Sequence, residues 1–283
     1  MTQTSHTNQI NLSERAISVI HKMLEESSEK YPGQLDRVRE MVGNLLSGVV
    51  VESDNPRQRP YFYFPYIKNQ PWYNPADFEA VGILESNWHT INTELERALR
   101  QMKGFEPYIH QTARETDPFE GDMNVFFLRN AFTNDRERLE RNRKICPETT
   151  AIVDNLPRSG EIALISALNP HTHLPPHCGA ENLRQTIHLA LRVPEGCELR
   201  VCDERHGWTP GKCMAFDDSF EHEAWNRSDK TRFVLLLDVW HPDLLDGEIY
   251  FFKRVGPLLN ESTDDEESRL AQMSLDGKKW WTD

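Results

Sequence analysis

The sequence has few cysteines, no long hydrophobic run and a deficit of positive charge. Its five cysteines are an odd number spread over 283 residues, which does not fit a disulfide framework and indicates a reducing compartment. No segment approaches the ~18 consecutive apolar residues of a membrane-spanning helix. The polar stretch 1–15 lacks the apolar core of a signal peptide. We therefore expect a cytoplasmic protein.

The charge balance narrows the possible partners. Lys and Arg number 32 and Asp and Glu 45, which gives a formal net charge of −13. A surface this negative repels phosphate backbones and anionic headgroups, so we expect neither nucleic acid nor a membrane as a partner. The oligomeric state is left open.

The pattern of apolar residues changes along the chain. Up to residue 120 it is mostly helical, with a long amphipathic helix predicted over 78–102 and a proline- and aromatic-rich extended stretch at 57–75. From Gly121 onward, short β-type runs alternate with Pro, Gly and Asn clusters, which is typical of an all-β sandwich or jelly roll. We predict helical and aromatic-rich packing over 1–120, a β core over 121–256 and an acidic tail over 257–283.

Histidines concentrate in the predicted β core, most densely in HTHLPPHC (171–178). A structural zinc site would need a second, well-spaced ligand pair, which is missing because Cys197 and Cys202 are five positions apart. His177 and His222 both follow turn residues at strand ends, and a jelly roll brings such ends together, where imidazoles suit Fe(II). The alternative is two unrelated histidines in surface loops.

A buried arginine points to an anionic ligand. Arg232 begins the run TRFVLLLDVW, which is apolar on both faces, and a buried guanidinium needs an anionic partner. Asp238 shares its face but lies six residues away, ~20 Å along a strand. Arg184, Thr186 and His188 share one face of a neighbouring strand, and Ser166 interrupts another apolar strand. Together these residues predict a carboxylate-binding cavity.

Four ordered motifs resemble one family. They are NPHTHLPPHCGAEN, IHLALRVPEGCELRV, FDDSFEHEAWN and RFVLLLDVWHPDL, spread from about Gly121 to Leu244. They resemble the aspartyl/asparaginyl β-hydroxylases, which are oxygenases that use Fe(II), 2-oxoglutarate and O2. The resemblance implies a mainly β fold with flanking helices, a cupin-like double-stranded β-helix (jelly roll) with an N-terminal helical buttress.

The resemblance also implies residue roles. His177 and His222 would bind iron, Arg232 and Ser166 would hold the distal carboxylate of 2-oxoglutarate, and His188 would help to hold this cosubstrate. Arg184 would line the substrate pocket. The implied activity is hydroxylation of an unactivated C–H bond in an amino acid, an amino-acid residue or a related small metabolite, possibly in a peptide, with succinate and CO2 as coproducts.

Two positions leave the chemistry open. Gly179 stands where most 2-oxoglutarate oxygenases have a carboxylate ligand. The hydroxylases that this sequence resembles lack that carboxylate, and so do radical halogenases, so a halogenase that uses this vacant position is an alternative. Thr186 stands where the family usually has a second arginine, which weakens the case for an acidic substrate. Trp225 is a further candidate for the substrate pocket. A cupin-like metal protein without 2-oxoglutarate chemistry is the remaining alternative, although it leaves Arg232 unexplained.

Overall fold

The computed structural model describes residues 14–49, 51–101, 105–107, 121–131, 133 and 135–260. In these ranges, no helix combines the length and apolar character that crossing a bilayer requires. The last helix, α7 (Asp246–Asn260), crosses the expected boundary at residue 256. The rest of the expected acidic tail lies outside the described residues.

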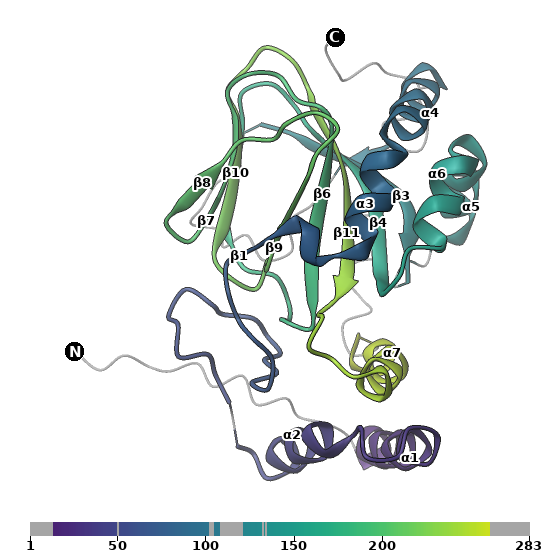
Figure 1. Ribbon diagram of the computed structural model, residues 1–283, viewed down its shortest axis with the longest axis vertical. Coiled ribbons are helices and arrows are strands. Elements are labelled where there is room, and N and C mark those ends of the chain that lie inside the picture. Colours follow the sequence, from purple (N-terminus) through teal and green to yellow (C-terminus); the bar gives the residue numbers. More distant parts are fainter. Residues whose placement is uncertain are drawn as a thin grey trace.

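Two antiparallel sheets pack against each other (Figure 1). The larger has the strand order β1-β9-β6-β11-β4-β3-β2 and the smaller β5-β10-β7-β8. The prediction of a mainly β, cupin-like double-stranded β-helix with N-terminal helices is confirmed. The strand bounds are β1 Trp72–Tyr73, β2 Glu106–Pro107, β3 Met123–Asn130, β4 Ser159–Leu168, β5 Thr172–His177, β6 Arg184–Arg192, β7 Cys197–Val201, β8 Glu204–His206, β9 Cys213–Phe216, β10 His222–Asn226 and β11 Arg232–Trp240.

Four helices cover the outer face of the larger sheet (Figure 1). They are α3 (Glu79–Ser86), α4 (Trp88–Gln101), α5 (Arg136–Ile145) and α6 (Pro147–Asp154), with a short 3-10 turn, η1 (Pro75–Asp77), before them. The prediction of one long helix over 78–102 is wrong. Asn87 ends α3, since its side-chain amide and its backbone N–H bond the carbonyls of the last turn, and α4 begins after it.

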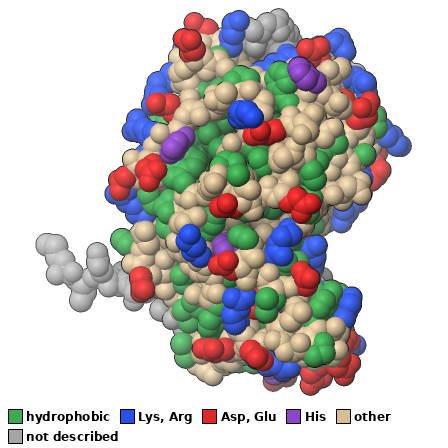
Figure 2. Space-filling model, viewed as in Figure 1, with side chains coloured by type: hydrophobic (Ala, Val, Ile, Leu, Met, Phe, Trp, Pro, Cys, Tyr) green, Lys and Arg blue, Asp and Glu red, His purple; other side chains and the backbone are tan. Residues whose placement is uncertain are grey.

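The N-terminal helices and α7 form a second apolar cluster below the sheets (Figure 1). Helix α1 (Glu14–Lys30) packs on α7, and α2 (Asp36–Leu46) adds Val38 and Val42 to the cluster. Charged side chains of both signs are interspersed over the face shown in Figure 2. The cluster joins the ends of β6 and β11, because Leu183 and Trp240 belong to it.

The extended stretch 57–73 crosses one end of the barrel, as its prolines and aromatics predict. Its backbone bonds to two loops of the barrel: the Phe62 N–H donates to the Ala180 carbonyl, and the Arg59 N–H donates to the Ser219 carbonyl. One loop follows β5 and the other precedes β10. The stretch therefore ties together the two loops next to His177 and His222.

Candidate active site

Two histidines from neighbouring strands lie side by side at the end of the smaller sheet. His177 is the last residue of β5 and His222 is the first of β10, and the antiparallel register pairs them directly. Their ring centroids are 4.0 Å apart. The structure thus brings together the two histidines that the sequence analysis selected as iron ligands.

A backbone carbonyl orients each imidazole. Nδ1 of His177 lies 2.8 Å from the Pro175 carbonyl oxygen, and Nδ1 of His222 lies 2.9 Å from that of Phe220. Because a carbonyl only accepts, we assign the proton to each Nδ1, which places the lone pair of each ring on Nε2, the atom that would bind a metal. In the described part of the chain, no group of three or more His, Cys, Asp or Glu side chains is arranged to hold a metal ion, so this site offers two ligands.

Arg232 is buried in the interior between the sheets. The residue is 3 % exposed, and its Nε and Nη1 atoms make no hydrogen bond in the structure. Burial lowers the pKa of its guanidinium to about 10, so the group stays charged at neutral pH. Its carbon Cζ lies 5.0 Å from the ring centroid of Trp208. Asp238 does not neutralise it, since that carboxylate pairs with Arg184 at 2.9 Å.

A second unsatisfied donor belongs to His188. Nδ1 of His188 accepts a hydrogen bond of 3.3 Å from the indole N–H of Trp208, so the neutral ring carries its proton on Nε2. That Nε2 is buried and has no partner. Burial, with Arg232 and His222 nearby, holds the pKa of His188 well below its usual value, and the ring is therefore neutral.

Strand register places Ser166 in the same interior. On β11, Arg232, Val234 and Leu236 alternate onto one face. Ser166 of β4 is paired with Val234, and His188 of β6 is paired with Leu236. Ser166 is 1 % exposed. Phe216 closes the row, with its ring 5.2 Å from that of His188 and 5.5 Å from that of His222.

These donors fit a dicarboxylate beside a metal. Buried donors without an acceptor are costly, so the unsatisfied N–H groups of Arg232 and His188 indicate a missing anion. Each presents N–H donors suited to carboxylate oxygens. The two-histidine pair adjoins them through Phe216. The residues present therefore fit an iron ion and a bound 2-oxo dicarboxylate.

Asp218 fills the space where Gly179 lacks a side chain. A Cβ built on Gly179 would lie 2.4 Å from Oδ1 of Asp218, well inside van der Waals contact. The Gly179 N–H also donates to the Asp218 backbone carbonyl at 2.6 Å, and the Thr186 hydroxyl bonds the Asp218 carboxyl. Burial, followed by the charge of Glu181, raises the pKa of Asp218 to about 7.

Arg184 lies at the same end of the barrel, but its charge is already matched. Its guanidinium forms ion pairs with Glu181 at 2.6 Å, Asp238 at 2.9 Å and Glu161 at 3.1 Å. It shares a face of β6 with Thr186 and His188. Arg184 thus adjoins the predicted pocket without offering an unmatched positive charge to a substrate.

Trp225 lies on the other side of the smaller sheet. Strand alternation puts it on the face opposite the buried Ala224 and Asn226. Its ring stacks on His173 at 5.0 Å and contacts the guanidinium groups of Arg205 and Arg227, each at 4.8 Å. The structure does not bring Trp225 to the histidine pair, because β10 turns its even-numbered side chains inward.

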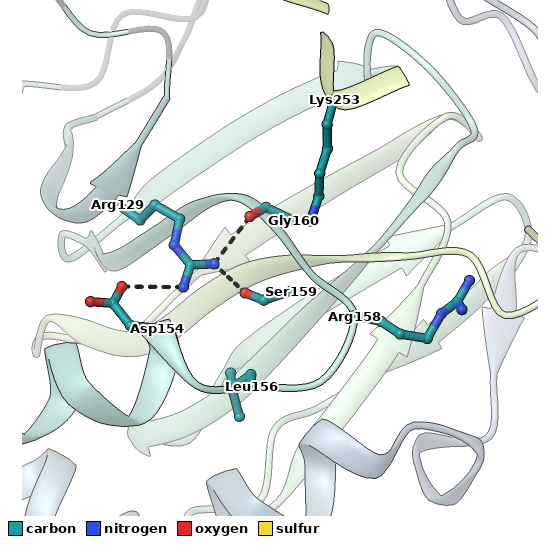
Figure 3. Close-up of a pocket in the computed structure, with 7 residues that line it drawn as sticks. All are labelled: Arg129, Asp154, Leu156, Arg158, Ser159, Gly160 and Lys253. Carbon is teal, nitrogen blue, oxygen red and sulfur yellow. Dashed lines mark hydrogen bonds and ion pairs between the residues drawn. The ribbon is translucent and has the colours of Figure 1, made fainter. Parts of the chain in front are cut away.

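The cavity drawn in Figure 3 lies away from these residues. It measures about 380 Å³ and is lined by Arg129, Asp154, Leu156, Arg158, Ser159, Gly160 and Lys253. In Figure 3, the Arg129 guanidinium is held by Ser159, Gly160 and Asp154. None of the predicted site residues lines this cavity.

Three residues of the site were not selected from the sequence as functional. Trp208 and Phe216 look like core aromatics in the sequence, and Asp218 looks like a turn residue. Only the fold shows that Trp208 sets the proton position on His188 and that Asp218 faces Gly179. The doublet Asp217–Asp218, five and four residues before His222, was the one available signal.

Comparison with known proteins gives the same assignment. A family model described as aspartyl/asparaginyl beta-hydroxylase matches residues 85–242. The chain is 35 % identical over 199 residues to the human aspartyl/asparaginyl beta-hydroxylase, covering 66 % of this chain and 25 % of that protein. It is 35 % identical over 181 residues to the ornithine lipid ester-linked acyl 2-hydroxylase of Rhizobium tropici, covering 62 % of each.

A third relative is the human aspartate beta-hydroxylase domain-containing protein 2, 32 % identical over 202 residues, which cover 68 % of this chain and 53 % of that protein. The chain thus spans between a quarter and about three fifths of these relatives. The matched family region holds both histidines and the buried arginine. On this evidence the chain belongs to the aspartyl/asparaginyl β-hydroxylase family.

Proposed function

We propose that the chain is an Fe(II)- and 2-oxoglutarate-dependent dioxygenase. It would hydroxylate an unactivated C–H bond of an amino acid, an amino-acid residue or a related small metabolite, with succinate and CO2 as coproducts. The observation that carries this proposal is the set of buried, unsatisfied donors on Arg232 and His188 beside a pair of histidines with oriented Nε2 atoms.

Each residue has a defined part in this proposal. His177 and His222 would hold iron, Arg232 and Ser166 would bind the distal carboxylate of 2-oxoglutarate, and His188 would donate from Nε2 to the same cosubstrate. When bound, iron and 2-oxoglutarate supply the oxidising chemistry that activates O2. The apolar walls around them, Phe216 included, exclude water from the pocket.

Asp218 favours hydroxylation over halogenation. A halogenase would need chloride in the space left by Gly179, but the Asp218 carboxyl group lies against that position. Because the pKa of Asp218 is about 7, part of the carboxyl is ionised at neutral pH and repels chloride, whereas the group hydrogen-bonds water in either protonation state. The position of Asp218 therefore favours a water molecule over a halide ion in the space next to Gly179.

The relatives support hydroxylation but differ in what they act on. One is named for aspartyl and asparaginyl hydroxylation and another for hydroxylation of an acyl chain of ornithine lipid. The reaction type is the shared element of these names. The substrate of this chain must therefore be inferred from its own pocket.

Succinate formation tests the proposal. Purified protein with Fe(II) under air should convert 2-oxoglutarate to succinate, faster with a substrate than without. His177→Ala and Arg232→Ala should each reduce the rate at least about 100-fold, because the first removes a ligand and the second the charge that binds the cosubstrate. The matched controls are His173→Ala and Arg227→Ala on the outer face of the smaller sheet. Equal losses in variants and controls, or no succinate at all, would refute the proposal.

A further inference from the structure

The end of the pocket next to Gly179 carries an excess of carboxyl groups. Glu161, Glu181 and Asp238 surround Arg184, and Asp218 lies near this group and against Gly179. We call these four the acidic rim. Among the described residues, Arg184 is the one cation that forms an ion pair with any of them, so negative charge remains unmatched.

The acidic rim is next to the reaction centre rather than on a remote surface. Asp218 touches the position of a Gly179 side chain, two residues after His177. Thr186 hydrogen-bonds Asp218 and shares its face of β6 with His188. A substrate that reaches the histidines from this end must therefore pass or contact the rim.

The rim is poorly matched to a carboxylate substrate. The guanidinium of Arg184 already bonds Glu181 and pairs with two more carboxylates, and Thr186 adds no charge. Introducing another anion here would place it among like charges without a donor of opposite charge. Exclusion of acidic substrates is the direct consequence.

Several observations indicate that a cation is missing from the rim. The Glu161 side chain is mostly buried, with one hydrogen bond to Arg184 through Oε2. Burial raises the pKa of Glu161 above its usual value, and the neighbouring carboxylates add to this. Asp217, beside Asp218, is fully buried, and its Oδ2 has no hydrogen-bond partner. An added positive charge nearby would stabilise the ionised form of these carboxyl groups.

We infer that the substrate presents an ammonium or guanidinium group to the acidic rim, so the enzyme selects a cationic substrate. That the cationic ligand is the substrate of a hydroxylation rests on the proposed function. The preference for binding a cation does not depend on it. Glu161 and Asp218 would be the specificity-determining residues. The side chains of Glu161 and Glu181 are 12 % and 16 % exposed, so a ligand can reach them from solvent.

Three probes with side chains of different charge, one cationic, one neutral and one anionic, test the inference. They are the N-acetyl amides of lysine, norleucine and glutamate, titrated calorimetrically into protein loaded with Zn(II) and 2-oxoglutarate, and into metal-free protein. The lysine amide should bind at least about tenfold more tightly than the norleucine amide, and the glutamate amide least tightly. Equal affinities, no binding of the lysine amide, or a preference for the glutamate amide would overturn the inference.

Two variants locate the preference. Glu161→Gln should reduce the lysine-to-norleucine affinity ratio several-fold, whereas the matched control Glu195→Gln, on the exposed turn before β7, should leave the ratio unchanged. Thr186→Arg should shift the preference toward the glutamate amide. An unchanged ratio in Glu161→Gln would exclude the rim as its source. Succinate formation without a cation preference would refute this inference alone, and a cation preference without succinate would refute the proposed function alone.

Discussion

Gly179 and Asp218 lie so close together that any side chain at position 179 would overlap the Asp218 carboxyl group. The built Cβ of Gly179 comes within 2.4 Å of the Asp218 carboxyl. The loop after β5 and the loop before β10 therefore meet at a glycine and a carboxylate. This contact lies next to the paired ends of the strands that carry His177 and His222.

A double-mutant cycle should reveal this contact. Gly179→Ala forces Asp218 or the loop to move and should destabilise the protein by about 1–3 kcal/mol, as overpacking does. Asp218→Ala should remove much of that cost in the double variant, with a coupling energy above about 0.5 kcal/mol. Denaturant unfolding of the metal-free proteins measures it. Additive effects would contradict the contact.

We expect Arg232 to lower the stability of the ligand-free protein although it enables 2-oxoglutarate to bind. A buried guanidinium without a carboxylate partner is costly, so Arg232→Met should leave the ligand-free protein equally stable or stabilise it by about 1–3 kcal/mol. The same variant should lose the rise in Tm that 2-oxoglutarate with Zn(II) gives the wild type. Thermal unfolding with and without these ligands measures both. Marked destabilisation of the ligand-free variant would show that Arg232 has a structural partner.

The raised pKa of Asp218 predicts a pH-dependent stability. The carboxyl has a pKa of about 7 in the folded protein, against 3.8 ordinarily. Between these values the folded state holds a proton that the unfolded chain has lost, so the free energy of unfolding falls as pH rises from 3.8 to about 7 and this contribution is level above it. Asp218→Asn should flatten the fall in metal-free protein, whereas Asp203→Asn, an exposed aspartate, should not.

Trp208 should act on cosubstrate affinity through His188. Trp208→Phe removes the N–H that bonds Nδ1 of His188, so the ring is free to place its proton on Nδ1 and lose its Nε2 donor. The KM for 2-oxoglutarate should rise about three- to tenfold, as loss of one hydrogen bond implies, with metal affinity unchanged. Trp88→Phe is the matched control, because its indole N–H bonds the Ala190 carbonyl. Equal effects in both variants would mean a packing defect.

Strand periodicity was sufficient to predict the deep part of the site. The alternation in β11 and β6 fixes which side chains face inward, and the strand rise of ~20 Å over six residues correctly excluded Asp238 as the partner of Arg232. Periodicity failed where chain segments meet. Strand β5 contains Pro175 and Pro176 and lies at a sheet edge. Because proline is typical of turns and edge strands, the sequence pattern did not predict a strand here. Contacts between loops, such as Gly179 with Asp218, have no local sequence signal.

Trp225 is the predicted site residue whose position in the structure differs most from the prediction. From the sequence it is a candidate for the substrate pocket, but the ring lies on the outer face between Arg205 and Arg227. Trp225→Ala should therefore keep succinate formation and substrate binding within about twofold of wild type, while removing two exposed cation–π contacts worth about 0.5–1 kcal/mol each. Steady-state kinetics and denaturant unfolding on the same preparations measure both effects. A KM for substrate raised tenfold or more would place the substrate on the outer face of the smaller sheet and contradict the interior site.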